Sequence, residues 1–493
     1  MKKMIVLLSF LLIFHGISHA QAYSQSGGNI TLTGKTYTTS TIDESGVLVT
    51  NSGVFTLTNS IVSTTGNSSN VNNSSQYGTN AGVFANTAGV IFLNNGDTII
   101  TTGSGANGLF ASGAGSSISM TNGRITTSGA NAHGVDVTYT GTIILNNVDV
   151  TTSGASSSVL ATDFGGGTVT VTGGTHISTA TIAGSHSAGI YSTGNITVNS
   201  ASVTSMGDNA AVIDADGIIH LTNTYLSGAM NGLMVHKTVP GSYTAIMTTT
   251  GGSITANGGD VLYITGATAS INLSGGTTTT SSSGILLDAV STSVATFNAS
   301  EEILSGNFVT DNTSSMTLNF ATNSHLTGAI NSANTCTSVS LSLDSTSIWT
   351  VTADSYVPIV LDPGWIIGDS VINIIGNGHN VYYNGTLANT SYLGNMIYKL
   401  RNGGLLTCAT CSVGINEIST PSAIKCFPNP ANEMVNLHTS NSVTSHLVVY
   451  NAQGSKIYEG TMANEKRLST STWSNGLYIV LIGSEFTKLF VEH

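Results

Sequence analysis

The chain has few charged residues, few cysteines and few prolines. Of its 493 residues only 7% are Asp, Glu, Lys or Arg, against roughly 25% in an ordinary globular domain. Its 12 basic residues leave no basic footprint, so no nucleic-acid partner is expected. Four cysteines are too few for a disulfide scaffold. The scarcity of Glu and Lys disfavours a helical protein, whose surfaces need such residues.

Glycine, hydroxyl-bearing residues and asparagine are abundant instead. The chain contains 57 Gly and long tracts of Ser, Thr and Asn, and 40% of its residues are apolar. A disordered chain would combine low hydrophobicity with high net charge, whereas the formal charge here is −12. The composition therefore predicts a long all-β protein whose outer faces carry hydroxyls and amides.

Residues 1–22 have the pattern of a secretory signal peptide. Lys2 and Lys3 form a basic start, an apolar run follows at 5–14, and small residues allow cleavage after Ala20 or Ala22. The run is too short to cross a membrane, and no later segment reaches the ~18 apolar residues of a membrane-spanning helix. We therefore expect an exported protein without a transmembrane segment.

A repeat runs through the middle of the chain. Three copies of one pattern start 26 residues apart, at Gly82, Gly108 and Gly134. Each start is followed by an apolar run, then by Asn, and then by a run that ends in Thr and Gly. Weaker copies follow at other spacings, and they begin near Gly46, Ser158, Gly189, Ala211, Gly232, Asp260 and Gly284.

Each repeat predicts three short strands separated by Gly, Asn or Ser turns. One unit cannot bury its apolar residues alone, but stacked units can, and their backbones pair from turn to turn. The pattern predicts a parallel β-helix of about 15 coils, with about 4.8 Å per coil. Longer loops are expected at 64–76 and 240–249, and an irregular segment at 358–365 is expected to cap the open end. A β-sandwich array with similar turns is the alternative.

The repeat resembles the right-handed parallel β-helix of autotransporter-type adhesin passengers over residues 28–400. The resemblance lies in the repeat pattern, and in a stretch at 347–355 around Trp349 that is similar to the Trp-containing late coils of those passengers. It implies a right-handed parallel β-helix with an extended structural or binding role.

The composition changes after Gly404. Residues 406–422 are expected to form a linker. Alternating strands and turns then predict a small antiparallel β-sandwich over 423–493. The motif residues of this domain are Pro428, Asn429, Pro430, Ala431, Tyr450, Gly454, Asn475, Gly476 and Tyr478.

These motifs and their spacing resemble the C-terminal sorting domain of type IX secretion cargo, over residues 415–493. The resemblance implies passage across the outer membrane by the type IX machinery, followed by surface attachment or release. Many such domains end on a basic residue, whereas this chain ends on Val491, Glu492 and His493. The expected organisation is a signal peptide (1–22), a β-helix (23–405), a linker (406–422) and a sorting domain (423–493).

The β-helix offers little for catalysis. Lys35, Arg124 and Lys237 are its only basic residues between Ala22 and Tyr398, too few for a uronate lyase. A glycosidase needs two nearby carboxyls, and Asp214 with Asp216 is the best local pair, with His220 continuing the same alternation. Gly217 favours a turn at Asp216 instead.

No enzyme activity, metal ion or cofactor is expected. The histidines are scattered and lack metal-ligand spacing. Cys408 and Cys411 form a CxxC that favours a structural disulfide in an exported protein. Cys336 and Cys426 could pair with each other or with these two. The four cysteines allow three complete pairings, and the sequence does not choose among them.

The function predicted from the sequence is that of an exported adhesin-like protein. Its uncharged exterior suits an extended partner such as a glycan or another cell-surface polymer. The first alternative is a polysaccharide-active enzyme that uses Asp214 and Asp216. The second is an ice-binding protein, for which Thr101, Thr126 and Thr151 would form an outward ladder; regular Thr rows over about five coils would support it.

Overall fold

The computed structural model describes residues 22–361, 365–409, 424–440, 443–483 and 485–493. Nearly all of its regular structure is β-strand. The chain divides into two compact units, 1–411 and 412–493. The predicted signal peptide lies almost wholly outside the described residues, as does most of the predicted linker.

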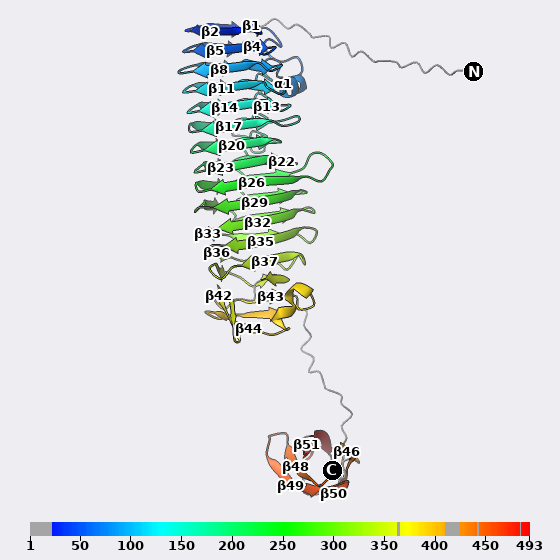
Figure 1. Cartoon of the computed structure of the whole chain (residues 1–493). Coiled ribbons are helices and arrows are strands. Elements are labelled where there is room, and N and C mark those ends of the chain that lie inside the picture. Colours follow the sequence, from blue (N-terminus) through cyan, green and yellow to red (C-terminus); the bar gives the residue numbers. More distant parts are fainter. Residues whose placement is uncertain (1–21, 362–364, 410–423, 441–442, 484) are drawn as a thin grey trace, which may run out of the picture. The chain divides into compact units, whose positions relative to one another are not determined.

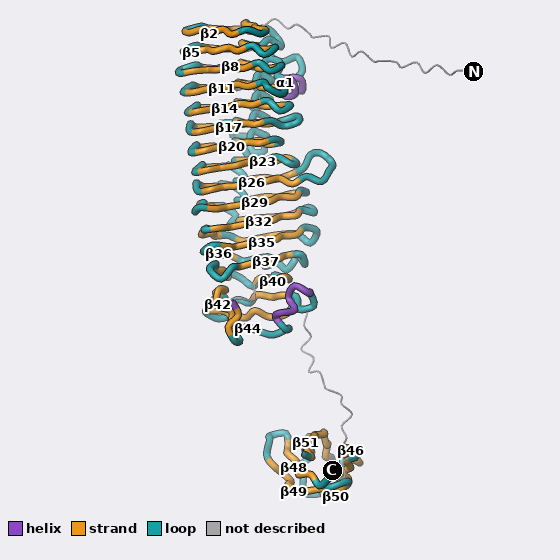
Figure 2. Tube along the Cα trace, in the orientation of Figure 1, coloured by secondary structure: helices purple, strands orange, loops and turns teal. Residues whose placement is uncertain are grey.

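The first unit is a parallel β-helix of about 15 turns (Figures 1 and 2). Its turns supply strands to three parallel sheets, which we name A, B and C. Sheet A has 12 strands: β1 (Tyr23–Ser26), β4 (Val47–Thr50), β7 (Val83–Asn86), β10 (Leu109–Ser112), β13 (Val135–Thr138), β16 (Leu160–Thr162), β19 (Ile190–Ser192), β22 (Ala211–Asp214), β25 (Leu233–His236), β28 (Leu262–Thr265), β31 (Ile285–Val290) and β34 (Asn307–Thr310).

Sheet B is the longest, and its strands stack one above another in Figure 1. Its 14 strands are β2 (Asn29–Thr33), β5 (Val54–Thr58), β8 (Val90–Asn94), β11 (Ser117–Thr121), β14 (Thr142–Asn146), β17 (Thr168–Thr172), β20 (Asn195–Asn199), β23 (Ile218–Thr222), β26 (Thr244–Thr250), β29 (Thr268–Ser274), β32 (Val294–Ser300), β35 (Ser315–Ala321), β37 (Val339–Leu343) and β40 (Ile359–Leu361).

Sheet C completes the first ten turns with a short strand each. Its ten strands are β3 (Thr36–Thr39), β6 (Ile61–Thr64), β9 (Thr98–Thr101), β12 (Arg124–Thr127), β15 (Asp149–Thr152), β18 (Thr175–Ser178), β21 (Ser202–Ser205), β24 (Tyr225–Gly228), β27 (Ser253–Ala256) and β30 (Thr278–Ser281).

The strand registers confirm the strongest part of the predicted repeat. Val83, Leu109 and Val135, which follow the three glycines spaced 26 residues apart, pair directly with one another in sheet A. Three of the weaker copies are confirmed too, since Gly46, Gly189 and Gly232 directly precede residues of the same column in sheet A. Another is displaced by one residue, because Val159 rather than Ser158 takes the glycine position, as the pairing of Leu160 with Val135 requires.

The core lies between the three sheets, and alternation sends every second side chain into it. One continuous cluster of buried Val, Ile, Leu, Ala and Phe side chains runs through the whole solenoid. Its largest fully buried members include Trp349, Trp365 and Tyr383 near the C-terminal end. Because each turn packs only on its neighbours, the stability of the solenoid accumulates turn by turn.

The predicted outward ladder of Thr101, Thr126 and Thr151 is wrong. Thr126 pairs with Ile100, not with Thr101, so the outward row is interrupted by an isoleucine. Thr101 is fully buried at the end of its strand, and its hydroxyl donates to the carbonyl of Ala106 at 2.5 Å. Thr127 and Thr152 repeat this bond to the residue five positions on, at 2.9 Å each. These threonines therefore shape an inner corner.

Two excursions leave the regular turns, near the places where longer loops were predicted. The first, between β6 and β7, contains the helix α1 (Val71–Tyr77), which the sequence analysis did not predict (Figure 2). The side chain of Asn70 caps α1 by accepting from the amides of Asn72 and Asn73. The second excursion joins β25 to β26.

The C-terminal end of the solenoid is closed differently from the prediction. Ile359–Leu361 does not form an irregular cap but extends sheet B as β40. The last turns form a fourth, mixed sheet, in which β44 (Tyr398–Arg401) and β45 (Leu405–Cys408) pair antiparallel. A 3₁₀ helix, η2 (Ala388–Leu393), packs on β40.

The second unit is a small antiparallel β-structure with its own core. One sheet has the order β46-β47-β50 and the other β49-β48-β51-β52. The strands are β46 (Ile424–Phe427), β47 (Met434–Thr439), β48 (Ser445–Asn451), β49 (Lys456–Met462), β50 (Glu465–Ser469), β51 (Gly476–Ile482) and β52 (Glu485–Val491).

Candidate functional site

The structure separates the candidate carboxylates Asp214 and Asp216. Asp214 ends β22 on sheet A and is buried, whereas Asp216 lies exposed in the following turn, where Ala215 has a φ of 57°. His220 lies on β23, in sheet B. The three residues therefore do not extend one alternating strand face, and the turn interpretation of Asp216 describes its place in the structure.

The carboxylate of Asp214 is occupied by protein donors. Its Oδ1 accepts the amide of Thr238 at 2.9 Å. Its Oδ2 accepts the hydroxyl of Thr238 at 2.5 Å and the hydroxyl of Tyr191 at 3.2 Å. These bonds hold the start of the excursion between β25 and β26 against sheet A.

Replacing Asp214 tests this anchoring role. In Asp214→Asn, one carboxylate oxygen is replaced by an NH₂ group, which donates and therefore faces a donor that the carboxylate accepted. We expect a loss of about 1–3 kcal/mol of unfolding free energy. Asp216→Asn, the matched change on an exposed turn, is expected to alter it by less than about 0.5 kcal/mol. Urea denaturation measures both, and equal losses would contradict the assignment.

The structure brings two further carboxylates toward Asp214. Asp136 lies on β13, and Asp163 follows β16 on the next turn. Burial, with the nearby Asp163, raises the pKa of Asp136 well above its ordinary value. Burial likewise raises the pKa of Asp163 to about 6, against the opposing amide of Phe164 and with help from Asp214.

The sequence contained a signal for Asp136 that was not used. In the aligned repeats, Asp136 stands where the first two copies have Phe84 and Phe110, and the registers confirm this equivalence. Val135 and Val137 on either side point into the core, so these three residues point to the outer face of sheet A. An acid in a column of phenylalanines marks an unusual environment.

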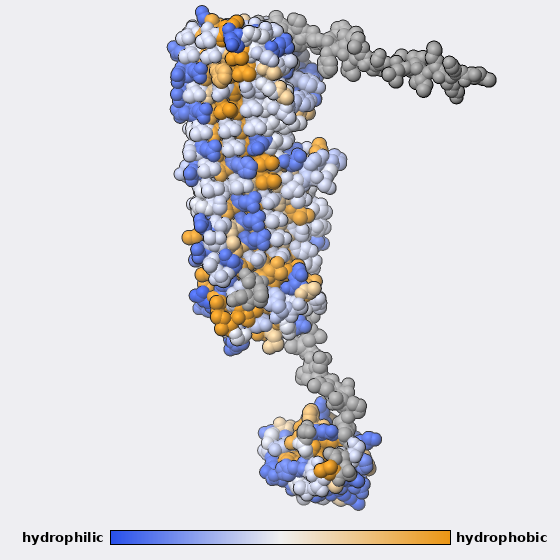
Figure 3. Space-filling model, viewed as in Figure 1, coloured by the Kyte–Doolittle hydropathy of each residue, from blue (hydrophilic) through white to orange (hydrophobic). Residues whose placement is uncertain are grey.

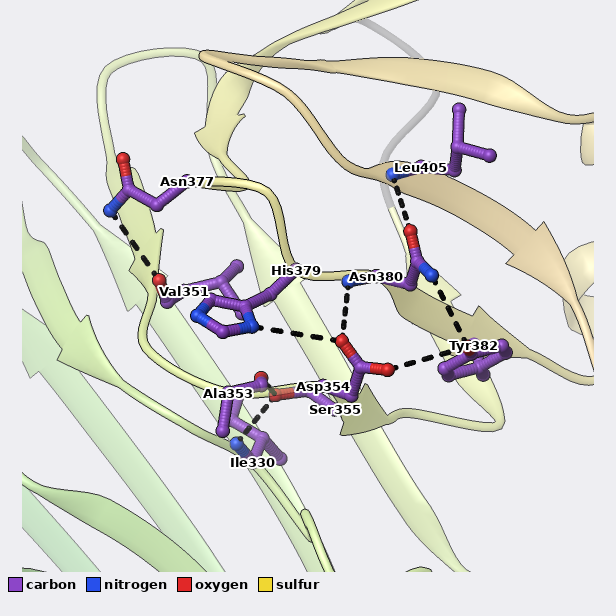
Figure 4. Close-up of polar contacts among 10 residues, drawn as sticks. All are labelled: Ile330, Val351, Ala353, Asp354, Ser355, Asn377, His379, Asn380, Tyr382 and Leu405. Carbon is purple, nitrogen blue, oxygen red and sulfur yellow. Dashed lines mark hydrogen bonds and ion pairs between the residues drawn. The ribbon is translucent and has the colours of Figure 1, made fainter.

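A polar cluster joins the last turns of the solenoid (Figure 4). The Oδ1 of Asp354 accepts the amide of Asn380 at 2.9 Å and lies 3.8 Å from Nδ1 of His379. Its Oδ2 accepts the hydroxyl of Tyr382 at 3.4 Å. Asp354, His379 and the adjacent Ser355 have the residue types of a catalytic triad.

Their geometry does not form a triad. The hydroxyl of Ser355 donates to the carbonyl of Ala353 at 2.9 Å and accepts the amide of Ile330 at 3.1 Å. Figure 4 shows these bonds on a different side of the strand from the Asp354 carboxylate. The cluster therefore holds adjacent turns together, and the hydroxyl of Ser355 is not presented to His379.

Two hollows on the solenoid surface offer little chemistry. One of about 340 Å³ is lined by glycines, hydroxyl-bearing residues and Asn307, without a titratable group. The other, of about 480 Å³, contains Asp97, Arg124 and Asp149. Across the described parts of the chain, no three His, Cys, Asp or Glu side chains come close enough to hold a metal ion.

The cysteines divide into bonded and free. Cys408 is disulfide-bonded, whereas Cys336 and Cys426 are free thiols. This excludes a bond between Cys408 and either of these two. Cys411, the other half of the predicted CxxC disulfide, lies outside the described residues. Burial raises the pKa of the Cys426 thiol to about 11, so it stays protonated at neutral pH.

In the second unit, the Pro-Asn-Pro-Ala motif ties the first strand to the last. The side-chain amide of Asn429 donates to the carbonyl of Lys488 at 2.9 Å, and its Oδ1 accepts the amide of Phe490 at 2.8 Å. Ala431 is fully buried, and its amide donates to the carbonyl of Phe490 at 2.7 Å. Pro428 and Pro430 both follow cis peptide bonds.

The remaining motif residues form turns and their supports. Tyr450 lies near the end of β48, and Gly454, with a φ of 79°, closes the turn to β49. The hydroxyl of buried Tyr478 donates to the carbonyl of Ser474 at 2.8 Å. Asn475 and Gly476 begin the β51 segment, where the Asn475 Oδ1 accepts the amide of the terminal His493 at 3.0 Å.

This geometry defines a solenoid with a separate C-terminal β-domain. Residues 425–491 match the secretion system C-terminal sorting domain family. The second unit is thus a sorting domain of the Por type, which implies secretion and cell-surface attachment through the type IX system. No curated protein matches the chain. Within the described residues, no helix combines the length and apolar character of a membrane span.

Proposed function

We propose that the protein is an exported, adhesin-like binding protein whose solenoid presents sheet B to an extended, uncharged polymer such as a neutral glycan. The signal peptide at 1–22 would deliver the chain to the cell envelope, and the sorting domain would carry it outward. The single observation behind the binding role is that none of the 14 strands of sheet B carries Asp, Glu, Lys or Arg.

The outward positions of sheet B supply many weak contacts over about 60 Å of stacked strands. Their central row consists mainly of hydroxyls and amides, as at Thr170, Thr197 and Thr248. Lower in the sheet, the amide of Asn298 donates to Asn272, and that of Asn319 to Asn298, at 2.8 Å each. Figure 3 shows a mostly pale surface with some orange, hydrophobic and some blue, hydrophilic stretches.

Apolar side chains interrupt the upper part of the same row. Phe92 is 40% exposed and Ile144 is 38% exposed. Such groups pack against the apolar faces of sugar rings, while neighbouring hydroxyls and amides bond to sugar hydroxyls. An acidic glycan would lose hydration around its charged groups on this surface without gaining a basic partner, whereas a neutral glycan has no such charges. The surface therefore favours neutral over acidic glycans.

The other predicted functions receive less support. Ice binding called for regular Thr rows over about five coils, but Phe92, Ser119 and Ile144 break the central row of sheet B. Glycoside hydrolysis needs two carboxyls facing a substrate, but Asp214 is bonded to protein donors and Asp136 is fully buried.

Matched charge insertions test the binding face. Thr197→Arg with Thr248→Arg places two cations in the central row of sheet B. Thr204→Arg with Thr255→Arg makes the same change on half-buried outward positions of sheet C. We expect the first pair to weaken binding to a neutral glycan or target cell by about tenfold or more, and the second by less than about twofold.

The assay uses the full chain on a glycan array and on whole cells, beside a reducing-sugar release assay. Saturable binding lost only in the sheet B variant supports the proposal. Equal losses in both variants, or no saturable binding, would contradict it. Release of reducing sugar would replace it with the enzyme alternative.

A further inference from the structure

Asp136 is a buried acid with no countercharge. It is fully buried although it points to the outer face of sheet A, and neither carboxylate oxygen has a hydrogen-bond partner among the described residues. A carboxylate in such a place loses its hydration, and the nearby amide of Val137 offsets only part of that loss, so it is held as the neutral acid. Something must therefore cover it on the side where solvent would lie.

The cover is the excursion between β6 and β7. Its helix α1 packs beside β13, along the upper turns of the solenoid (Figure 1). The carbonyl of Gln76 accepts the hydroxyl of Thr138 at 3.1 Å, and the ring of Tyr77 stacks on Tyr139 with centroids 6.2 Å apart. The Gln76 amide also bonds to the Tyr139 hydroxyl. These contacts attach α1 to Thr138 and Tyr139, which lie two and three residues after Asp136 in the chain.

The same excursion covers an apolar patch. Phe84 and Phe110 form a small cluster of their own with Ala81, outside the main core. A Cβ on Gly78 would lie 2.4 Å from the Phe110 ring, so the chain passes directly over it. Phe110 pairs with Asp136 in the sheet register. Raising the cover would therefore expose two phenylalanines and the acid together.

Among the described residues, the charged groups that interact with Asp136 include no cation. The neighbouring turns contribute Asp163, Tyr191 and Asp214, and Asp163 opposes its ionisation directly. The excursion from Thr65 to Gly82 contains no Asp, Glu, Lys, Arg or His, and its one titratable side chain is Tyr77. On the same turn, burial lowers the pKa of His133 to about 4, so its ring is neutral.

We infer that the excursion at 65–82 is an acid-latched cover, closed while Asp136 carries a proton and released as that proton is lost. The open state gives Asp136 an ordinary, solvated carboxyl, whereas the closed state holds the neutral acid. Closure thus binds a proton, and the closed state becomes less favourable as the pH rises from the open-state pKa toward the raised closed-state pKa. Release exposes Phe84 and Phe110 to solvent.

Hydrogen exchange on the full chain between pH 6 and 8 tests the latch, after correction for intrinsic exchange rates. The opening constant of the amides at 65–82 is expected to rise with pH, by up to tenfold per pH unit below the raised pKa of Asp136, since one proton is released per opening. Asp136→Asn keeps the shape but cannot ionise, so the slope should vanish and the cover stay closed. Asp216→Asn, an exposed control, should keep the slope of the unmodified chain.

Three outcomes would overturn the latch. One is a flat response in the unmodified chain, and another is an undiminished slope in Asp136→Asn. The third is a slope abolished by Ca²⁺ and restored by EDTA, which would mean that the carboxylates take a cation in place of the proton. Should Asp136→Asn fail to fold by circular dichroism, the slope of the unmodified chain at 65–82, compared with the amides of β14, still decides.

Discussion

A chain that lacks residues 412–493 is expected to accumulate inside the cell envelope instead of reaching the surface or the medium. The deletion removes the whole second unit, including the segment that matches the sorting domain family, and leaves the solenoid unit with its own core. Fractionation and immunoblotting of cells with a working type IX system measure the outcome. We expect export to fall by about tenfold or more, because the sorting role belongs to the C-terminal domain and the fold of the solenoid does not replace it.

A subtler variant separates the sorting role from the mere presence of a second unit. Asn429→Ala removes the two bonds that tie the first strand of the domain to Lys488 and Phe490. It is expected to lower export while the solenoid still folds. His438→Ala, on an exposed position of β47, serves as the control and should export normally. Surface appearance of the truncated chain at the level of the full chain would contradict the sorting assignment.

The sequence predicted the solenoid well where glycine, apolar residues and Asn recur at one spacing. The pairing of Val83, Leu109 and Val135 follows from a pattern in which alternation and turn chemistry agree. Asn122 and Asn147 likewise form the corner expected from their place after the apolar run. The side-chain amide of Asn122 donates to Asn95 on the previous turn at 3.1 Å, and that of Asn147 donates to Asn122 at 2.9 Å.

The errors arose at corners, where a single residue changes direction. Thr101 belongs to its strand by sequence, but its hydroxyl turns inward to the carbonyl of Ala106. Alternation alone cannot show this, because the last position of a strand is set by the turn that follows. Asp216 was paired with Asp214 by the same period-two rule, although the strand ends at Asp214.

The environment of Asp136 depends on a segment about 60 residues earlier in the chain. Its position on an outward column could be predicted, but its burial comes from an excursion whose length and sequence break the repeat. Spacing arguments treat such insertions as loops and assign them no neighbours. The cover and the acid it hides therefore emerged only from the folded chain.

Adding one methyl group at Gly129 is expected to be among the most damaging small changes in the solenoid. A Cβ there would lie 1.9 Å from the carbonyl oxygen of Gly103 on the previous turn. The same contact recurs at Gly154, whose Cβ would lie 1.9 Å from the Gly129 oxygen. The clashing atom belongs to the backbone, and hydrogen bonds between the turns fix its position. It therefore cannot move aside as cheaply as the end of a flexible side chain could. We expect Gly129→Ala to cost about 3 kcal/mol of unfolding free energy.

Gly113→Ala separates this overlap from backbone strain. Gly113 has a φ of 87°, and its nearest neighbour to a new Cβ lies 3.9 Å away, so alanine there meets strain without a clash. The expected cost is about 1–2 kcal/mol. Urea denaturation followed by circular dichroism compares the two variants. A Gly129→Ala loss no larger than that of Gly113→Ala would mean that the turns can separate locally. The glycine column would then tolerate side chains, and the spacing of the solenoid would be set by its strands alone.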